Sequence, residues 1–413
     1  MTRRVAITGL GAIASTGNDI PSLWDSIKAG RSGIGPIGNI PTARLLAQVA
    51  AEIRNFDPLA HFEPRKLALL DRAAQLALVA AREAVRSSGI DTTAAGSRGG
   101  VVLGAAIGQE TYDSSYKSFY GDGAPRVHPF TVPRIMPSGS ASHISMEFGL
   151  RGPTVAMASA CASANHAIGH AFHMIRAGML DMAITGGADA SIVVGFMKSW
   201  EALRVLSPDS CRPFSADRNG LVIGEGGAMF VLESWEQALA RGATIHAELI
   251  GFGSSADAGD IIAPDAGGAV SAMRAALDDA GLPPDAIDYV NAHGTGTRLN
   301  DRTEVAALRA LFGTHLDRMA VSSTKSMLGH CMTASGALEL AATILGLRDG
   351  ILPPTIGFTA VDPECDIDCV ANHARPAPIE IALSNSFAFG GLNATLVARR
   401  ASVSGETMNR AAA

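Results

Sequence analysis

Residues 154–165 read Thr154-Val155-Ala156-Met157-Ala158-Ser159-Ala160-Cys161-Ala162-Ser163-Ala164-Asn165. The apolar run over 154–158 predicts a buried strand, and the following pattern predicts a helix that continues to Ile175 and stops near Gly178. Cys161 therefore falls on a strand-to-helix turn. Free helix N–H groups and the positive end of the helix dipole favour thiolate over thiol there. Taken alone, this stretch fits a reactive cysteine and a buried structural cysteine equally well.

Short apolar runs alternate with longer helical patterns along the rest of the chain. Apolar runs at 5–7, 100–103, 154–158, 182–185 and 228–232 predict buried strands. A period of 3.6 residues predicts helices over 67–87, 270–280 and 303–311. This alternation predicts a layered α/β fold.

The second half of the chain restarts the pattern of the first. Residues 247–250 lead into Gly251-Phe252-Gly253, as residues 5–8 lead into Gly9-Leu10-Gly11, and each glycine pair is expected to end its strand in a tight turn. We therefore predict an internal duplication with a divide near residue 245. The expected parts are a first half over 1–245, a second half over 246–400 and a frayed tail over 401–413.

Composition excludes several classes of function. The chain has 413 residues, of which 47% are hydrophobic and 17% charged, and its net charge of −6 argues against nucleic acid as a partner. No apolar stretch reaches the ~18–20 residues of a membrane span. The segment after Arg3 and Arg4 is broken by Gly9, so it does not resemble a signal peptide. Five scattered cysteines predict a reduced, cytoplasmic protein.

Two patterns imitate cofactor sites but fit them poorly. Gly9-x-Gly11-x-x-Ala14 resembles a dinucleotide fingerprint, yet the acidic residue expected about 20 positions later at the end of a second strand is missing. Three histidines share one helical face without a carboxylate or cysteine at ligand spacing: His166, His170 and His173. We expect neither a metal nor a cofactor. The four other cysteines are expected to be free or structural: Cys211, Cys331, Cys365 and Cys369.

Three further segments carry residues suited to thioester chemistry. His293 stands in a turn of small residues over 291–297, and Lys325 stands five positions before His330 at the end of another apolar run. A loop over 385–391 holds two phenylalanines among glycines, whose backbone N–H groups could face an oxyanion. A cysteine nucleophile can hold an acyl chain, and neutral imidazole N–H groups can stabilise the enolate formed when a second thioester loses CO2.

These segments resemble the β-ketoacyl-acyl-carrier-protein synthase II group of the thiolase superfamily. The likeness covers about residues 3–399. Its motifs are Ser159-Ala160-Cys161-Ala162-Ser163, Cys211-Arg212-Pro213-Phe214-Ser215-Ala216-Asp217-Arg218, Gly224-Glu225-Gly226, His293-Gly294-Thr295-Gly296-Thr297, Asn300-Asp301-x-x-Glu304, Lys325-Ser326-Met327-Leu328-Gly329-His330 and Asn385-Ser386-Phe387-x-Phe389-Gly390-Gly391. Residues 198–206 and 362–368 resemble the rhizobial nodulation-protein-E branch. Type II polyketide ketosynthases are the near competitor.

The resemblance implies a five-layered αβαβα thiolase fold built from two similar halves, and an enzyme that condenses an acyl group on Cys161 with malonyl-carrier protein. It implies that His293 and His330 serve decarboxylation and condensation, and that Lys325 supports the second histidine. Phe389 corresponds to the gating phenylalanine, whose N–H would join that of Cys161 in an oxyanion hole. The remaining implied supporting acids are Glu339, beside the lysine, and the water-organising pair Asp301 and Glu304.

The resemblance also implies binding residues, and the chain departs from the family pattern at two positions. It implies an acyl pocket lined by Ile107 and Trp200, with Thr295 and Thr297 binding substrate. Its expected basic rim for an acidic acyl carrier protein consists of Arg65, Lys66, Arg126 and Arg204. Ala388 replaces a glycine common between the loop phenylalanines, and Leu392 replaces a common threonine. Ala388 would stiffen the loop if that position needs a positive φ.

Three alternatives belong to the same superfamily. A thiolase needs a second catalytic cysteine late in the chain, where His330 stands instead. An initiating ketosynthase uses Cys-His-Asn, against which His330 also argues. A chain-length-factor-like partner subunit usually lacks the cysteine, which is present here as Cys161. The expected assembly is a homodimer, or a heterodimer with a related subunit.

Overall fold

A computed structural model of the chain describes residues 2–401. All of the predicted tail except Ala401 lies outside the described residues. Within residues 2–401, no helix is both long and apolar enough to cross a bilayer.

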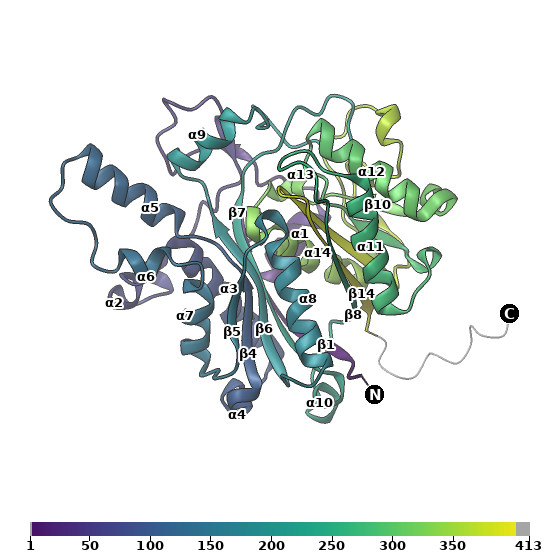
Figure 1. Cartoon of the computed structure of the whole chain (residues 1–413), viewed down its shortest axis with the longest axis horizontal. Helices are drawn as coiled ribbons and strands as arrows, with labels where there is room; N and C mark the ends of the chain where they lie inside the picture. The colour runs from purple at the N-terminus through teal and green to yellow at the C-terminus, as the bar shows by residue number, and fades with distance from the viewer. Residues whose placement is uncertain (1, 402–413) are drawn as a thin grey trace.

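Two five-stranded sheets with the same topology form the centre of the molecule (Figure 1). The first has the order β5-β4-β6-β7-β1, with bounds Thr154–Met157, Gly99–Gly104, Met182–Ala190, Glu225–Ser234 and Val5–Ala14. The second has the order β10-β9-β13-β14-β8, with bounds Ala320–Ser322, Tyr289–Asn291, Ile381–Ala388, Leu392–Arg400 and Ala247–Ala256. In each sheet the first three strands run parallel, and each of the last two strands runs antiparallel to the strand before it. A short antiparallel pairing of β1 with β8 joins the sheets.

Helices form three layers around the two sheets. Helices α8 (Ser163–Arg176) and α14 (Ser335–Asp349) contact each other and strands of both sheets, so they make the middle layer. Every α14 residue from Ser335 to Leu347 is buried, as expected for a helix enclosed on all sides. Outside lie α3 (Arg72–Ser88) and α7 (Gly139–Phe148) on the first sheet, and α11 (Ala266–Ala280) and α12 (Arg298–Phe312) on the second. The predicted αβαβα architecture is confirmed.

Shorter elements decorate these layers. The short helices are α1 (Ile20–Lys28), α2 (Pro64–Leu67), α4 (Thr92–Ala95), α5 (Gln109–Tyr116), α6 (Thr131–Ile135), α9 (Val194–Ala202), α10 (Trp235–Ala240) and α13 (Lys325–Leu328). Two small antiparallel pairs consist of β2 (Gly35–Pro36) with β3 (Val49–Ala50), and β11 (Ile351–Leu352) with β12 (Arg375–Pro376). Helices α5 and α6 form an arm that projects from the first half (Figure 1).

The predicted turns at the paired glycines are wrong. Strand β1 continues through Gly9 and Gly11 to Ala14, and β8 continues through Gly251 and Gly253 to Ala256. A Cβ at Gly9 would lie 2.2 Å from the Ala84 carbonyl oxygen of α3, and one at Gly251 would lie 2.4 Å from that of Ala276 in α11. The glycines therefore let an outer helix approach the strand instead of turning the chain.

The predicted helix over 67–87 is interrupted. Helix α2 ends at Leu67 and α3 begins at Arg72. Asp71 causes the new start, because its carboxylate accepts the N–H of Ala73 and caps α3. The other predicted helices lie within α11 and α12, and the five predicted strands coincide with β1, β4, β5, β6 and β7.

Candidate active site

Cys161 lies in a tight turn between β5 and α8, which we call the nucleophile turn (Ser159–Ser163). Ala160 has a φ of +46°, an unusual conformation for a residue with a Cβ. The Ser163 hydroxyl stabilises the turn, because it accepts the N–H of Ser159 at 2.9 Å and donates to the carbonyl of Ala160 at 2.7 Å. The thiol is therefore held at the start of the central helix.

One cavity of about 120 Å³ brings distant segments together. It contains Cys161 and both histidines, whose ring centres lie 5.6 Å apart with the planes at 84°. The predicted residues that line it are Cys161, Trp200, His293, Thr295, Thr297, His330 and Phe389. The sulfur and the two imidazoles thus share one space, reached by three separate stretches of chain.

Both histidines carry their proton on Nε2, because their Nδ1 atoms accept hydrogen bonds. The N–H of Met332 donates to Nδ1 of His330 at 3.1 Å, and the hydroxyl of Ser335 lies 2.8 Å from the same atom. The ammonium of Lys325 lies 3.4 Å from Nδ1 of His293. A neutral imidazole that accepts at Nδ1 carries its proton on Nε2.

Burial sets the charge of the three central groups. Burial, aided by the charge of Lys325, lowers the pKa of His293 and His330 well below the ordinary value, so both rings are neutral. Burial raises the pKa of the Cys161 thiol to about 12, although Lys325 opposes this shift. The predicted resting thiolate is therefore wrong: loss of water around the sulfur outweighs the nearby cation.

Lys325 contacts the first histidine, and its predicted support of His330 is wrong. Its ammonium donates to the carbonyl of His293 at 2.5 Å and pairs with the carboxylate of Glu339 on α14. All three groups are buried. Lys325 begins α13, and His330 follows Gly329, whose φ is +67°.

Asp301 and Glu304, on the first turns of α12, hold the loop that carries His293. Glu304 accepts the N–H groups of His293 and Gly294, both at 2.8 Å. Asp301 accepts the N–H of Gly296 at 3.2 Å and that of Phe214 at 2.9 Å. Burial raises the pKa of Glu304 to about 7. Both acids therefore satisfy buried backbone donors, and their predicted effect on water stays a prediction.

The loop after β13 closes one wall of the cavity. Phe389 stacks on Trp200 with ring centres 5.5 Å apart and planes at 19°. Positive φ values fall on Gly390 and Gly391. Ala388 is the last residue of β13, so it carries no backbone strain in this conformation. Phe387 also belongs to the strand, which makes the glycine loop shorter than predicted.

The predicted pocket residue Ile107 does not lie with the others. Its side chain is 44% exposed, beyond the end of β4 and outside the lining of this cavity. Among the predicted docking residues, Arg65, Arg126 and Arg204 are exposed. Lys66 is paired with Glu147 and is half-buried, so its charge is already partly matched.

Several cavity residues were missed by sequence reasoning. They are Val205, Leu221, Ile262, Pro264, Leu299 and Asn393. Most are ordinary apolar residues from five separate segments. Nothing in their local sequence distinguishes them from core residues, so their role appears only when the chain is folded.

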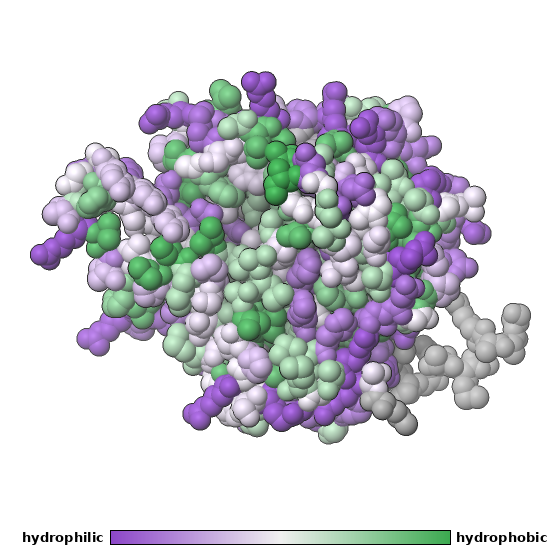
Figure 2. Space-filling view, viewed as in Figure 1, coloured by the Kyte–Doolittle hydropathy of each residue, from purple (hydrophilic) through white to green (hydrophobic). Residues whose placement is uncertain are grey.

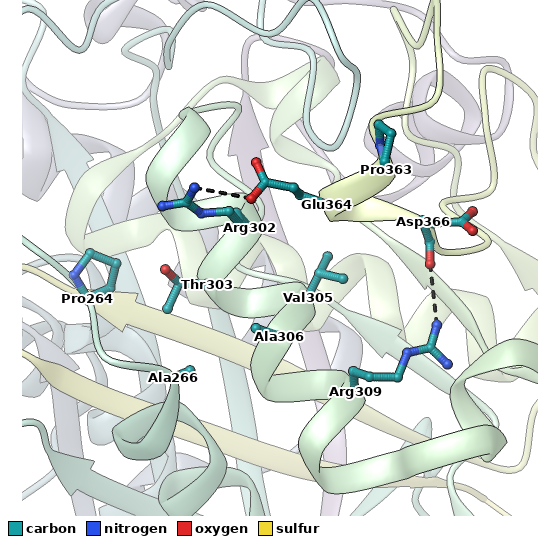
Figure 3. A pocket seen from close by; sticks show the side chains of 10 residues that line it. All are labelled: Pro264, Ala266, Arg302, Thr303, Val305, Ala306, Arg309, Pro363, Glu364 and Asp366. Carbon is teal, nitrogen blue, oxygen red and sulfur yellow. Dashed lines mark hydrogen bonds and ion pairs between the residues drawn. The ribbon is translucent and has the colours of Figure 1, made fainter.

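A larger, open hollow of about 570 Å³ adjoins the cavity on the side of α12 (Figure 3). Pro264 lines both spaces. Arg302 donates to Glu364 at 3.2 Å and Arg309 donates to the carbonyl of Asp366 at 3.4 Å. Both arginines therefore bond to neighbouring residues of the hollow, and neither lines the cavity that contains Cys161.

The other candidate ligands serve local contacts. His166 hydrogen-bonds with the hydroxyl of Ser159 at 2.8 Å, and His173 lies 3.2 Å from the carboxylate of Asp279. Their rings and that of His170 surround Phe252. All five cysteines are buried free thiols, as expected for Cys211, Cys331, Cys365 and Cys369.

Known protein families and curated proteins are similar in sequence to this chain. The model described as "Beta-ketoacyl synthase, N-terminal domain" matches residues 2–238, and "Beta-ketoacyl synthase, C-terminal domain" matches residues 246–359. Nodulation protein E of Rhizobium sp. (strain N33) is 47% identical over 402 residues, covering 97% of this chain and 100% of that protein. 3-Oxoacyl-[acyl-carrier-protein] synthase 2 of Staphylococcus aureus (strain COL) is 40% identical over 407 residues, covering 96% and 98%.

Solved structures of related proteins superpose on this chain over nearly its whole length. The ishigamide ketosynthase/chain length factor superposes with a TM-score of 0.93 at 37% identity, covering 97% of this chain and 100% of that chain. A type II PKS ketosynthase in complex with its acyl-carrier protein superposes with a TM-score of 0.89 at 28% identity, with the same coverage. The predicted family is confirmed: this chain belongs to the β-ketoacyl synthases, and it is a condensing enzyme of the acyltransferase type.

Proposed function

We propose that this β-ketoacyl synthase takes an acyl chain onto Cys161 and extends it with a malonyl unit delivered by an acyl carrier protein. The observation that carries the proposal is the shared cavity, where one thiol meets two neutral imidazoles that both present Nε2–H. That set matches a reaction in which a covalent thioester is attacked by an enolate.

The first step is thioester exchange at Cys161. The sulfur attacks the acyl carbonyl and the carrier thiol leaves. The proton of the Cys161 thiol passes to the departing carrier sulfur, so the exchange is balanced. Because the resting thiol has a raised pKa, proton loss accompanies C–S bond formation instead of preceding it.

The second step is decarboxylation and condensation. The malonyl thioester loses CO2, and the enolate oxygen accepts hydrogen bonds from Nε2–H of His293 and His330. The enolate carbon attacks the acyl-Cys161 carbonyl, whose oxyanion faces the N–H groups of Cys161 and Phe389. Collapse of the tetrahedral intermediate breaks the C–S bond to Cys161 and releases the β-ketoacyl thioester, and the Cys161 thiolate takes up one proton from solvent. A buried, water-poor cavity strengthens each of these hydrogen bonds.

Covalent labelling tests the first step. Wild-type protein incubated with an acyl thioester should gain the mass of one acyl group, and Cys161→Ala should not. Cys365→Ser is the matched control, since Cys365 is also a buried free thiol but lies outside the cavity. Labelling of Cys161→Ala to the wild-type level would defeat the proposal, whereas equal labelling of wild type and Cys365→Ser supports it.

The carrier protein is proposed to dock on the exposed arginines Arg65, Arg126 and Arg204. Opposite charges accelerate and orient docking, so charge reversal at Arg65 or Arg204 should raise KM for carrier-bound substrate. A small thioester should be unaffected. Arg86→Glu is the matched control, because Arg86 is exposed at the end of α3 that leads to the start of β4, opposite the Cys161 end of the sheet. Equal losses with both substrates would contradict carrier docking.

A second copy or a related subunit is proposed to cover the first half. Strand β5 is the edge of its sheet, and Val155 on it is 42% exposed. An open edge favours pairing with another chain. The arm formed by α5, α6 and the segment between them carries further exposed apolar side chains (Figure 2), and Phe119 and Val132 are among them. Sedimentation of wild type against Val155→Pro tests this: a dimer that persists unchanged in the variant contradicts pairing through β5.

A further inference from the structure

A buried carboxylate next to the cavity has no part in the steps above. Asp189 lies near the end of β6, is 4% exposed and does not line the cavity. It accepts the hydroxyl of Thr333 at 2.8 Å, the N–H of Thr333 at 3.2 Å and the hydroxyl of Ser191. Two of its three hydrogen bonds therefore come from one residue of another segment.

Thr333 belongs to the turn that holds the second histidine, which we call the histidine turn (His330–Ser335). Met332 in this turn has a φ of +43°, a strained value for a residue with a Cβ. Its N–H donates to Nδ1 of His330 at 3.1 Å, and the hydroxyl of Ser335 lies 2.8 Å from the same nitrogen. The orientation and tautomer of the imidazole therefore depend on the shape of this turn.

The turn is also pressed closely against β6. A Cβ on Gly187 would lie 2.8 Å from the carbonyl oxygen of Thr333, so the strand and the turn approach as near as a glycine allows. The Thr333 hydroxyl lies within 3.4 Å of the Ala188 carbonyl as well. A strained turn persists only where its surroundings determine it, and here Asp189 supplies the polar part of that support.

We propose that Asp189 is a positioning residue for His330, acting through Thr333 to keep the imidazole in the Nε2–H form that faces the enolate. The inference rests on the proposed function, because it concerns the decarboxylation step. It predicts a division of effects: loss of Asp189 harms the chemistry of His330 and does not slow the acylation of Cys161, because the hydrogen bonds of Asp189 go to Thr333 and Ser191 and none goes to the nucleophile turn.

Asp189→Ala should lower kcat for release of CO2 from malonyl-N-acetylcysteamine by about 10- to 100-fold, the effect expected from a misplacement of roughly 1 Å. KM should be unchanged, because Asp189 does not contact substrate. The rate of Cys161 acylation should not fall, because the charge of Asp189 contributes to the raised pKa of the Cys161 thiol and its loss makes that thiol more acidic. Asp189→Asn should restore most of the rate, since its amide oxygen can accept from Thr333 while Ser191 accepts from its NH2 group.

Two further measurements separate positioning from mere stabilisation. Nitrogen NMR of histidine-labelled protein should show one neutral tautomer for His330 in wild type and Asp189→Asn, and a mixture in Asp189→Ala. If Asp189→Ala does not fold, the pair Thr333→Val and Thr333→Ser replaces it: Thr333→Val should lose activity about 3- to 10-fold and Thr333→Ser should not. Ser191→Ala is the matched control, because it removes a bond to the same carboxylate without touching the histidine turn.

Equal decarboxylation by wild type and either Asp189→Ala or Thr333→Val would overturn the inference. Parallel losses of acylation and decarboxylation would also overturn it, since they indicate a general structural defect. The proposed function fails separately, if wild type itself neither acylates Cys161 nor releases CO2.

Discussion

The nucleophile turn and the histidine turn occupy the same place in the two halves but carry different chemistry. Each follows a strand of its sheet and opens a central helix, α8 or α14. Ala160 and Met332, at φ +46° and +43°, begin the same short 3₁₀ turn, and a serine begins each helix. The residue after Ala160 is Cys161, whereas the residue after Met332 is Thr333.

This difference shows how a duplicated backbone can support two roles. The first turn presents a sulfur to the cavity. The second directs its equivalent side chain away, to Asp189, and uses its backbone N–H to hold His330. Six residues after Cys161 and Thr333 the contrast recurs: Ala167 of α8 corresponds to Glu339 of α14, which pairs with Lys325. Backbone geometry is shared, and the side chains place the proposed nucleophile in one half and the proposed enolate-stabilising imidazoles in the other.

The largest expected effect is that mutations in the two turns impair different steps of the reaction. Cys161→Gln should abolish condensation, by at least about 10³-fold, because the acyl group has no attachment. It should keep or raise malonyl decarboxylation. His330→Ala should do the reverse: it should lower decarboxylation about 10²- to 10³-fold and leave Cys161 acylation intact. Product analysis and CO2 release measure both. Normal decarboxylation by His330→Ala would mean that the histidine roles are wrongly assigned.

Removal of the buried cation that distinguishes the second half should strongly destabilise the chain. Lys325→Met leaves the Glu339 carboxylate buried without its partner, which costs about 3–5 kcal/mol. Lys325→Met combined with Glu339→Gln should recover most of that loss. Denaturant unfolding of both single variants and the double variant measures the coupling. Additive losses would show that the pair is not a coupled unit.

Equivalent glycines test whether the halves are packed alike. Gly9→Ala and Gly251→Ala should each lower the free energy of unfolding by about 1–3 kcal/mol, since each new Cβ overlaps a helix carbonyl oxygen. Gly38→Ala is the control, because the nearest atom to its new Cβ is 3.6 Å away. Strongly unequal losses at Gly9 and Gly251 would contradict equivalent packing.

A pH dependence of stability is also expected, and the two buried histidines of the second half contribute to it. Burial lowers the pKa of His293 and His330 in the folded chain, so below pH ~6.5 the unfolded chain binds more protons than the folded one. Stability should fall as pH drops below that value, by up to about 1.4 kcal/mol per pH unit for each histidine. Unfolding of wild type and of His293→Asn/His330→Asn from pH 7 to pH 5 measures the difference. An identical decline in both proteins would show that these rings titrate normally.

Much of the site was predictable because its motifs are local. Strand-to-helix placement of Cys161 follows from apolar periodicity, and the family resemblance indicated which histidines accompany it. Sequence reasoning failed where burial or direction decided the outcome. The family resemblance implied that Lys325 supports His330, yet its ammonium donates to the carbonyl of His293. Cys161 was expected to be a thiolate, yet loss of water raises its pKa to about 12.

The sequence by itself determined the alternation of strands and helices, the repeat of that pattern and the identity of the candidate reactive side chains, because each depends on periodicity or residue type over a few neighbours. Only the tertiary structure decided that β1 and β8 continue through their glycines, that Asp189 meets Thr333, and that three stretches converge on one cavity. The physical reason is that these features depend on contacts between segments far apart in the chain. Close approach, loss of water and hydrogen-bond partners at such contacts have no signature in any short stretch of residues.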